Sequence, residues 1–323
     1  MLIFGFATDF AKREIILSAG SLDSPKILMH SGLGPKDQLE RFGIAVSKDV
    51  PAVGKGLRDH MFCPLVFKRK EGDNDRASFY GDEQVMEQAL EQWKHDGTGP
   101  WAKYACEMGI GWFKLKSLTS TDEYKALPTE TKEFLDKETV PHYEMLTHFP
   151  IHWFIPEFPP ENLSYSCLLI FYYNSQSRGE VKLQSHDPTK PLCIDPRFLA
   201  TPFDRRVAID SLREAFRVTK HEGYANNNTS TIAGPAGESD EDLLQYWKSN
   251  LSSSWHMTGT LKMGKKGDED AVVDKDFRFL GVDNLRVVDM SVVPVLPSCH
   301  TQAVAYVTGM TCAEKLIASQ SLS

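Results

Sequence analysis

The 323-residue sequence lacks the short signatures of several common enzyme classes. It contains no GxSxG, no HExxH and no CxxC, and its six cysteines are scattered along the chain. These absences argue against a hydrolase nucleophile elbow, a zinc peptidase and a zinc ribbon. Gly259–Lys266 imitates a phosphate-binding loop, but Lys266 stands where a magnesium-binding Ser or Thr belongs. His148 and His152 flank Pro150, and on a strand they would lie about 13 Å apart, so no metal site is expected.

The sequence also has fewer basic than acidic residues, and it has no long apolar run. Lys plus Arg is 36 against 44 Asp plus Glu, a net charge of −8, which argues against a nucleic-acid partner. The longest apolar stretches, 167–173 and 287–296, fall short of the roughly 18 residues that a membrane-spanning helix needs. Met1–Phe6 lacks the basic start of a signal peptide, whereas sequons leave export open, so the cellular location is unknown. The sequons begin at Asn162, Asn227, Asn228 and Asn250.

The N-terminal pattern predicts a strand, a turn and a helix. Glu14–Leu17 is almost wholly apolar and runs into Ser18-Ala19-Gly20, which is typical of a buried parallel strand that ends in a tight turn. We expect Asp23 or Ser24 to cap the helix that follows, and Gly32 to close it.

The rest of the chain contains segments with the apolar spacing of helices and segments with that of strands. A length of 323 residues predicts about two domains. Helices are predicted at 83–95, 203–220 and 240–251, strands at 142–154, 165–173 and 179–184, and a polar loop at 226–239. Further strands are predicted at 272–274, 277–280 and 285–288. Thr301–Ile317 should form a helix whose inward face carries Ala303, Val307, Met310, Ala313 and Ile317.

His256 and His300 differ from the other histidines in their surroundings. Each follows small or rigid residues just before a glycine turn or a helix start, where a side chain can project into a cleft. Imidazole has a reference pKa near 6.5, which suits a general base. Taken alone, each is either such a base or a structural histidine.

Several motifs that follow one another along the chain favour the general-base interpretation of these histidines. They are Gly20–Gly34, Val53–His60, Ser177–Leu183 with Asp187-Pro188 and Asp195-Pro196, and the block from His256 to His300. Together they resemble the glucose-methanol-choline (GMC) oxidoreductases, FAD-dependent enzymes that act on alcohols. Gly56 stands where that family usually has Asn, and no GxGxxG for the FAD pyrophosphate occurs. The sequence therefore looks like the C-terminal portion of a longer enzyme.

The resemblance implies an α/β plus α+β fold, namely an incomplete FAD-binding Rossmann-like domain with an inserted substrate domain of antiparallel sheet and helices. Residues 1–60 would be part of the FAD-binding domain and 61–225 the substrate-binding domain. Residues 226–323 would supply the active-site loop and the C-terminal return to the FAD-binding domain.

The resemblance also implies roles for individual residues. His256 matches the catalytic base, and His300 matches the residue that binds the substrate oxygen. The positions implied to contact FAD are Ala19, Gly20, Trp255, Asp289, Met290, Thr301 and Gln302. Two alternatives stay open: Trp255 packs in the core, and Asp289 only caps a turn.

The implied reaction is oxidation of a small-molecule alcohol to an aldehyde or ketone, with oxygen or a quinone as electron acceptor. One alternative is a flavin-free, non-catalytic fragment, because the pyrophosphate motif is missing. Another is a hydroxynitrile lyase-type relative, which keeps FAD without net redox chemistry.

Overall fold

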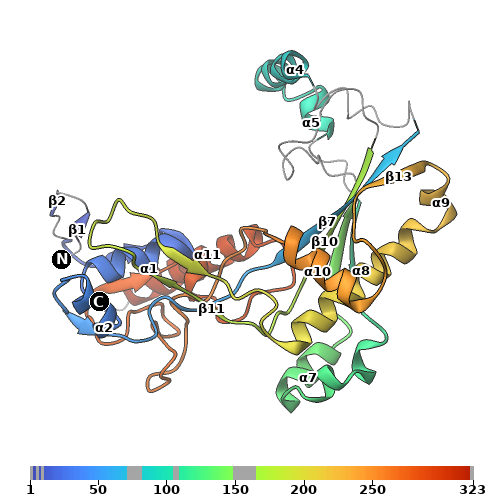
Figure 1. Ribbon diagram of the computed structural model, residues 1–323. Coiled ribbons are helices and arrows are strands. Elements are labelled where there is room, and N and C mark those ends of the chain that lie inside the picture. Colours follow the sequence, from blue (N-terminus) through green and yellow to red (C-terminus); the bar gives the residue numbers. More distant parts are fainter. Residues whose placement is uncertain are drawn as a thin grey trace. The chain divides into compact units, whose positions relative to one another are not determined.

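A computed structural model describes residues 3–4, 7–8, 11–70, 82–104, 109–147 and 165–320. The chain divides into two compact units, coloured along the sequence in Figure 1. Unit 1 comprises Met1–His60, Asn174–Thr201 and Ser253–Ser323, and unit 2 comprises Met61–Tyr173 and Pro202–Ser252. Residues 174–201, expected in the middle domain, group with unit 1 because their strand β11 (Gly179–Lys182) pairs with β6 (Lys55–Leu57).

Unit 2 is built on an antiparallel sheet with the strand order β13-β7-β10-β9-β8. Strand β10 lies centrally and is buried along its whole length, which explains its continuous apolar sequence and confirms the strand predicted at 165–173. Of the run 142–154, residues 143–147 form β9, while 148–154, with His148 and His152, lie outside the described residues. The bounds are β7 Met61–Arg69, β8 Ile110–Phe113, β9 Tyr143–Thr147, β10 Tyr165–Tyr172 and β13 Asn228–Ala233.

Strand β13 corrects the polar loop predicted at 226–239. The segment pairs with β7 through an irregular register, and its side chains stay largely exposed. Its Thr and Ile residues favour extended backbone, but nothing in so polar a sequence indicates the neighbouring strand that completes the ladder.

The helices of unit 2 pack beside this sheet. Figure 1 shows α8 (Pro202–Thr219) and α10 (Asp240–Asn250) alongside β7 and β10. Trp247 Nε1 donates to the Ala208 carbonyl at 2.7 Å, and the Tyr172 hydroxyl donates to Asp204 at 2.7 Å. The predicted helices at 83–95, 203–220 and 240–251 are confirmed. The remaining helices are α4 Glu83–Asp96, α5 Pro100–Tyr104, η1 Leu118–Ser120, α6 Asp122–Lys125, α7 Thr129–Asp136 and α9 Glu222–Ala225.

A parallel strand pair organises unit 1. Strands β3 (Ile15–Leu17) and β15 (Leu285–Val287) pair in parallel, although about 270 residues separate them along the chain. Both carboxyl ends therefore meet at one edge, where α1 (Gly20–His30) follows β3 and η3 (Met290–Val292) follows β15. Helix α1 begins before the expected caps, and its N-terminus has no side-chain cap. Gly32, with φ of +80°, closes the helix as expected.

The other elements of unit 1 are short, apart from the 19-residue helix α11. They are β1 Ile3–Phe4, β2 Ala7–Thr8, β4 Leu33–Gly34, α2 Lys36–Arg41, β5 Lys48–Asp49, β12 Cys193–Asp195 and α11 Gln302–Gln320, with β14 Ser252–Ser253 where the chain passes from unit 2 to unit 1. The strands predicted at 272–274 and 277–280 are wrong, since Val273 and Phe279 make only isolated bridges. Their apolar side chains instead fill the core of unit 1.

Helix α11 forms as predicted, but its predicted inward face is wrong. Val307, Met310 and Ile317 are 60%, 62% and 66% exposed, whereas Thr308 and Cys312 are buried. The helix carries apolar residues on several sides, so their spacing could not indicate which side covers the core. In the described part of the chain, no helix combines the length and apolar character needed to cross a membrane.

Candidate active site

Two distant segments of unit 1 meet through their backbones. Arg58 N–H donates to the Thr258 carbonyl at 3.0 Å, and Thr258 N–H returns a bond to Arg58 at 2.9 Å. The same two segments also meet at His60, whose carbonyl accepts the Ser254 N–H at 3.0 Å. This pairing brings the motif that ends at His60 against the segment that carries His256.

Glycines make this approach possible. Gly56 and Gly259 have φ of +81° and +85°, a conformation that glycine adopts without a Cβ clash. A Cβ on Gly259 would lie 2.7 Å from the Gly56 carbonyl oxygen, whereas one on Gly56 would make only ordinary contact. The departure from Asn at position 56 is therefore compatible with the backbone, because Asn is among the few other residues that tolerate positive φ.

Asp59 anchors the segment around His256. Its Oδ1 accepts the His256 backbone N–H at 2.9 Å, and its Oδ2 accepts the Ser253 hydroxyl. Burial raises the pKa of Asp59 to about 6, while these hydrogen bonds act in the opposite direction. The carboxylate thus holds both ends of the turn from Ser253 to His256.

Trp255 lies at the tip of that turn. It has φ of +58°, which is unusual for a bulky residue, and its N–H donates to Ser253 Oγ at 3.0 Å. Its side chain is 70% exposed, so the alternative that the indole packs in the core is wrong.

Three histidines lie together, with His256 in contact with both of the others. The rings of His256 and His300, the two residues singled out from sequence, lie 5.0 Å apart between centroids and almost perpendicular. His256 also contacts a third histidine, since His60 Nδ1 lies 3.0 Å from His256 Nδ1. His60 is buried, His256 is half-buried and His300 is exposed.

Sequence reasoning missed His60 as a member of this site. The available signal was its place in Asp59-His60, which closes the motif Val53–His60. Burial and the neighbouring His256 and His300 hold the pKa of His60 well below its usual value, so this ring is neutral. Among the described residues, no group of three or more His, Cys, Asp or Glu side chains is placed to hold a metal ion.

His300 leads directly into helix α11. Thr301 follows it, Gln302 begins the helix, and Ala305 N–H donates to the Thr301 carbonyl at 3.0 Å. The first backbone N–H groups of a helix have no partner within it, and the helix dipole places about half a positive charge there. The start of α11 is therefore a region of positive potential next to His300.

Asp289 joins the ends of the two parallel strands. Its Oδ2 accepts Gly20 N–H at 2.9 Å and the Ser24 hydroxyl at 2.5 Å, and its Oδ1 accepts Ser291 N–H at 2.7 Å. These bonds favour the turn-capping alternative for this carboxylate. They also place Met290, the first residue of η3, beside the start of α1.

Ala19 and Gly20 form the turn between β3 and α1. Ala19 N–H donates to Ser24 Oγ at 3.0 Å, so Ser24 serves this turn rather than capping the helix. Gly20 has φ of +87°, and a Cβ built on it would meet nothing within 4 Å. Open space therefore adjoins the backbone at the start of α1.

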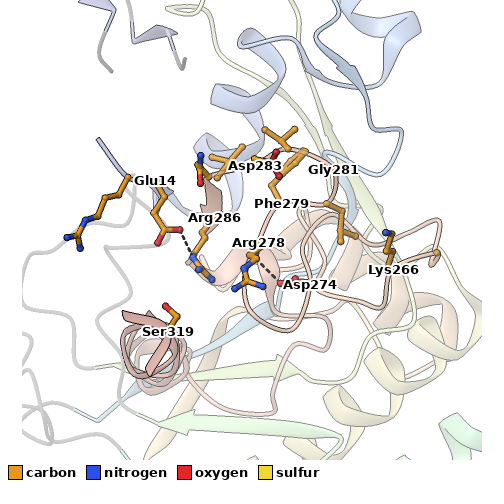
Figure 2. A pocket seen from close by; sticks show the side chains of 15 residues that line it. Glu14, Lys266, Asp274, Arg278, Phe279, Gly281, Asp283, Arg286 and Ser319 are labelled. Carbon is orange, nitrogen blue, oxygen red and sulfur yellow. Dashed lines mark hydrogen bonds and ion pairs between the residues drawn. The ribbon is translucent and has the colours of Figure 1, made fainter. Parts of the chain in front are cut away.

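Unit 1 has a further pocket, which the three histidines do not line (Figure 2). Arg286 Nε donates to Glu14 Oε2 at 2.6 Å on one side, and Arg278 N–H donates to Asp274 Oδ1 at 2.9 Å on another. Lys266 also lines the pocket. Both cationic and acidic side chains line it, so its charge favours no single class of ligand.

Comparison with known proteins shows which family the chain resembles. Two models for GMC oxidoreductases match residues 6–62 and 175–309. The chain is 32% identical over 297 residues to dehydrogenase pkfF of Emericella nidulans, covering 92% of this chain and 48% of that protein. It is 31% identical over 301 residues to pyranose dehydrogenase 3 of Leucoagaricus meleagris, with the same two coverages, 92% and 48%. The structure of Aspergillus oryzae formate oxidase superposes with a TM-score of 0.82 at 27% identity, covering 96% of this chain and 55% of that one.

These matches extend over nearly the whole chain, which spans about half the length of the curated relatives it matches. They agree with the mixed α/β fold and its antiparallel sheet. The family models and the relatives lead to one conclusion: the chain belongs to the GMC oxidoreductase family.

Proposed function

We propose that this chain carries the catalytic histidines of an FAD-dependent enzyme that oxidises an alcohol to an aldehyde or ketone. The observation that carries the proposal is the contact between His256 and His300, whose ring centroids lie 5.0 Å apart. In this proposal unit 1 is part of the FAD-binding domain, of incomplete Rossmann-like type, and unit 2 is the substrate-binding domain.

His256 acts as the general base. It accepts the proton of the substrate hydroxyl, while His300 hydrogen-bonds the same oxygen and orients it. Asp59 accepts the backbone N–H of His256 and so holds the backbone from which the ring projects, without using the ring nitrogens. A positioned base of this kind is worth about 10² to 10⁴ in rate.

The residues present fit the flavin end of FAD. The open space at Gly20 would let a planar ring approach the backbone at the start of α1. Met290 and Trp255 would be further contacts. When bound, FAD supplies the N5 atom that accepts hydride from the carbinol carbon. Backbone N–H groups at Thr301 and Gln302 would favour negative charge on the reduced ring. Asp289 would act through the turns that it caps.

The pyrophosphate end has no matching motif. The sequence contains no GxGxxG, the loop that holds the pyrophosphate in dinucleotide-binding units. Pyranose dehydrogenase 3 and formate oxidase, both similar to this chain, are named for different substrates, so alcohols of several classes are the substrates to test.

The test is an absorbance spectrum of the purified 323-residue chain with added FAD, before and after anaerobic addition of aromatic, aliphatic and sugar alcohols. We expect flavin bands that bleach with an alcohol, and a loss of about 10²-fold or more in the bleaching rate in His256→Ala. His186→Ala, at an exposed histidine of the same unit, is the matched control. Reoxidation by oxygen or by a quinone then identifies the electron acceptor.

Other outcomes assign the alternatives. A chain that retains no flavin supports the flavin-free, non-catalytic reading of this polypeptide. Retained flavin that no alcohol bleaches, together with cleavage of a hydroxynitrile, supports the lyase-type reading. Bleaching that persists at the full rate in His256→Ala contradicts the role given to this histidine.

A further inference from the structure

The contacts around His256 specify which of its two ring nitrogens carries the proton. In a neutral imidazole one nitrogen donates and the other accepts, and the hydrogen-bond partner of one nitrogen determines the state of the other. Two contacts bear on His256 Nδ1: His60 Nδ1 lies 3.0 Å away and Ser254 Oγ lies 3.3 Å away.

Ser254 provides the first constraint. Its hydroxyl lies 2.6 Å from the His60 carbonyl oxygen, which can only accept a hydrogen bond. A serine hydroxyl has one hydrogen, so that hydrogen is committed to His60 O. Toward His256 Nδ1, Ser254 Oγ can therefore act only as an acceptor.

His60 provides the second constraint. Because this ring is buried and neutral, only one proton is available between the two facing Nδ1 atoms. With Ser254 Oγ present as an acceptor, the proton satisfies both contacts when it resides on His256 Nδ1. His60 Nδ1 then accepts, and His60 carries its own proton on Nε2.

We propose that His60 and Ser254 are positioning residues that hold His256 in the tautomer protonated at Nδ1, leaving Nε2 with the lone pair that a general base needs. This inference rests on the proposed function for its catalytic meaning. The tautomer itself depends only on contacts within unit 1. Acceptors at Nδ1 would also stabilise the imidazolium once Nε2 has taken a proton.

The test is long-range ¹H–¹⁵N correlation NMR of the ¹⁵N-histidine-labelled 323-residue chain at pH 8, with His256 assigned from His256→Gln. We expect a pyrrole-like, protonated Nδ1 and a pyridine-like, unprotonated Nε2 at His256. The reverse pattern would overturn the proposal, and this measurement requires no substitution at His60 or Ser254.

Variants then test the named partners. His60→Phe removes the nearer acceptor and should lower the Nδ1-H to Nε2-H ratio of His256 by about three- to tenfold, the value of one neutral hydrogen bond. Ser254→Ala should change the ratio in the same direction. His60→Asn, which offers an amide oxygen near the position of Nδ1, should restore the ratio, and His186→Asn should leave it unchanged. An unaltered ratio in both His60→Phe and Ser254→Ala would refute the role of these residues.

The two proposals fail separately. The NMR measurement uses neither flavin nor alcohol, so the Nδ1-H tautomer in a chain that binds no FAD supports this inference while contradicting the proposed function. Flavin bleaching that depends on His256 in a chain with the opposite tautomer would contradict only this inference.

Discussion

Asp59 makes the stability of unit 1 depend on pH in a direction opposite to that of most protein carboxylates. Its side chain is 6% exposed, and burial raises its pKa from 3.8 to about 6. The folded chain therefore keeps this proton at pH values where the unfolded chain has lost it. Stability supplied by the protonated form is complete below about pH 4 and is lost as the pH rises through 6.

The magnitude follows from the shift. At about 1.4 kcal/mol per pKa unit, a rise of about two units corresponds to roughly 3 kcal/mol lost between pH 4 and pH 7. Asp59→Asn has no carboxyl to ionise, and its amide oxygen can still accept the His256 N–H. The stability of Asp59→Asn, measured as its free energy of unfolding minus that of the unsubstituted chain, should therefore rise by about 3 kcal/mol from pH 4 to pH 7.

The assay is urea unfolding at pH 4, 5, 6 and 7, followed by ¹⁹F NMR of 5-fluorotryptophan. Among the six tryptophans, Trp255 alone belongs to unit 1, so its signal reports on that unit. Asp283→Asn, at an exposed position of the same unit, controls for loss of an ordinary carboxylate. A difference between Asp59→Asn and the unsubstituted chain that stays constant from pH 4 to 7 would refute the reasoning.

Two further predictions concern backbone and burial. Gly54→Ala should destabilise the chain by about 3 kcal/mol, because φ is +83° and the new Cβ would lie 2.4 Å from the Val181 carbonyl oxygen. Gly43→Ala, with φ of +68° and open space, should cost only about 1 kcal/mol, and equal costs in urea unfolding would contradict the steric argument. In unit 2, burial lowers the pKa of His142 to about 4. The neutral ring therefore contributes about 3 kcal/mol of stability, which is complete above pH 6.5 and is lost as the pH falls toward 4. His142→Asn, which can still accept the Leu115 N–H, should flatten that dependence, and an unchanged slope would count against it.

The sequence alone was sufficient to predict a helix or strand where the apolar residues of the local pattern are also the buried ones. Strand β10 is buried on both faces, so its apolar run needed no partner to be recognised. Helices α8 and α10 have a buried face with regular spacing, and both were predicted within a residue or two. His256 and His300 were found because ordered motifs resembled a family, and the structure brings their rings together.

Tertiary structure decided whatever depends on contacts between distant segments. The polar β13 is a strand because β7 lies beside it, and α1 starts at Gly20 where Asp289 accepts its backbone N–H. The exposed side of α11 could not be predicted from the sequence, because apolar residues occur on several sides of this helix.

His60 shows the same division at the candidate active site. The sequence by itself determined the family, the main helices and strands, and the two histidines carried by motifs. Only the folded chain placed His60 Nδ1 3.0 Å from His256 Nδ1, with Ser254 committed to the His60 carbonyl. The state of an imidazole proton depends on which donors and acceptors surround the ring, and backbone pairing across almost 200 residues of sequence brings those groups together.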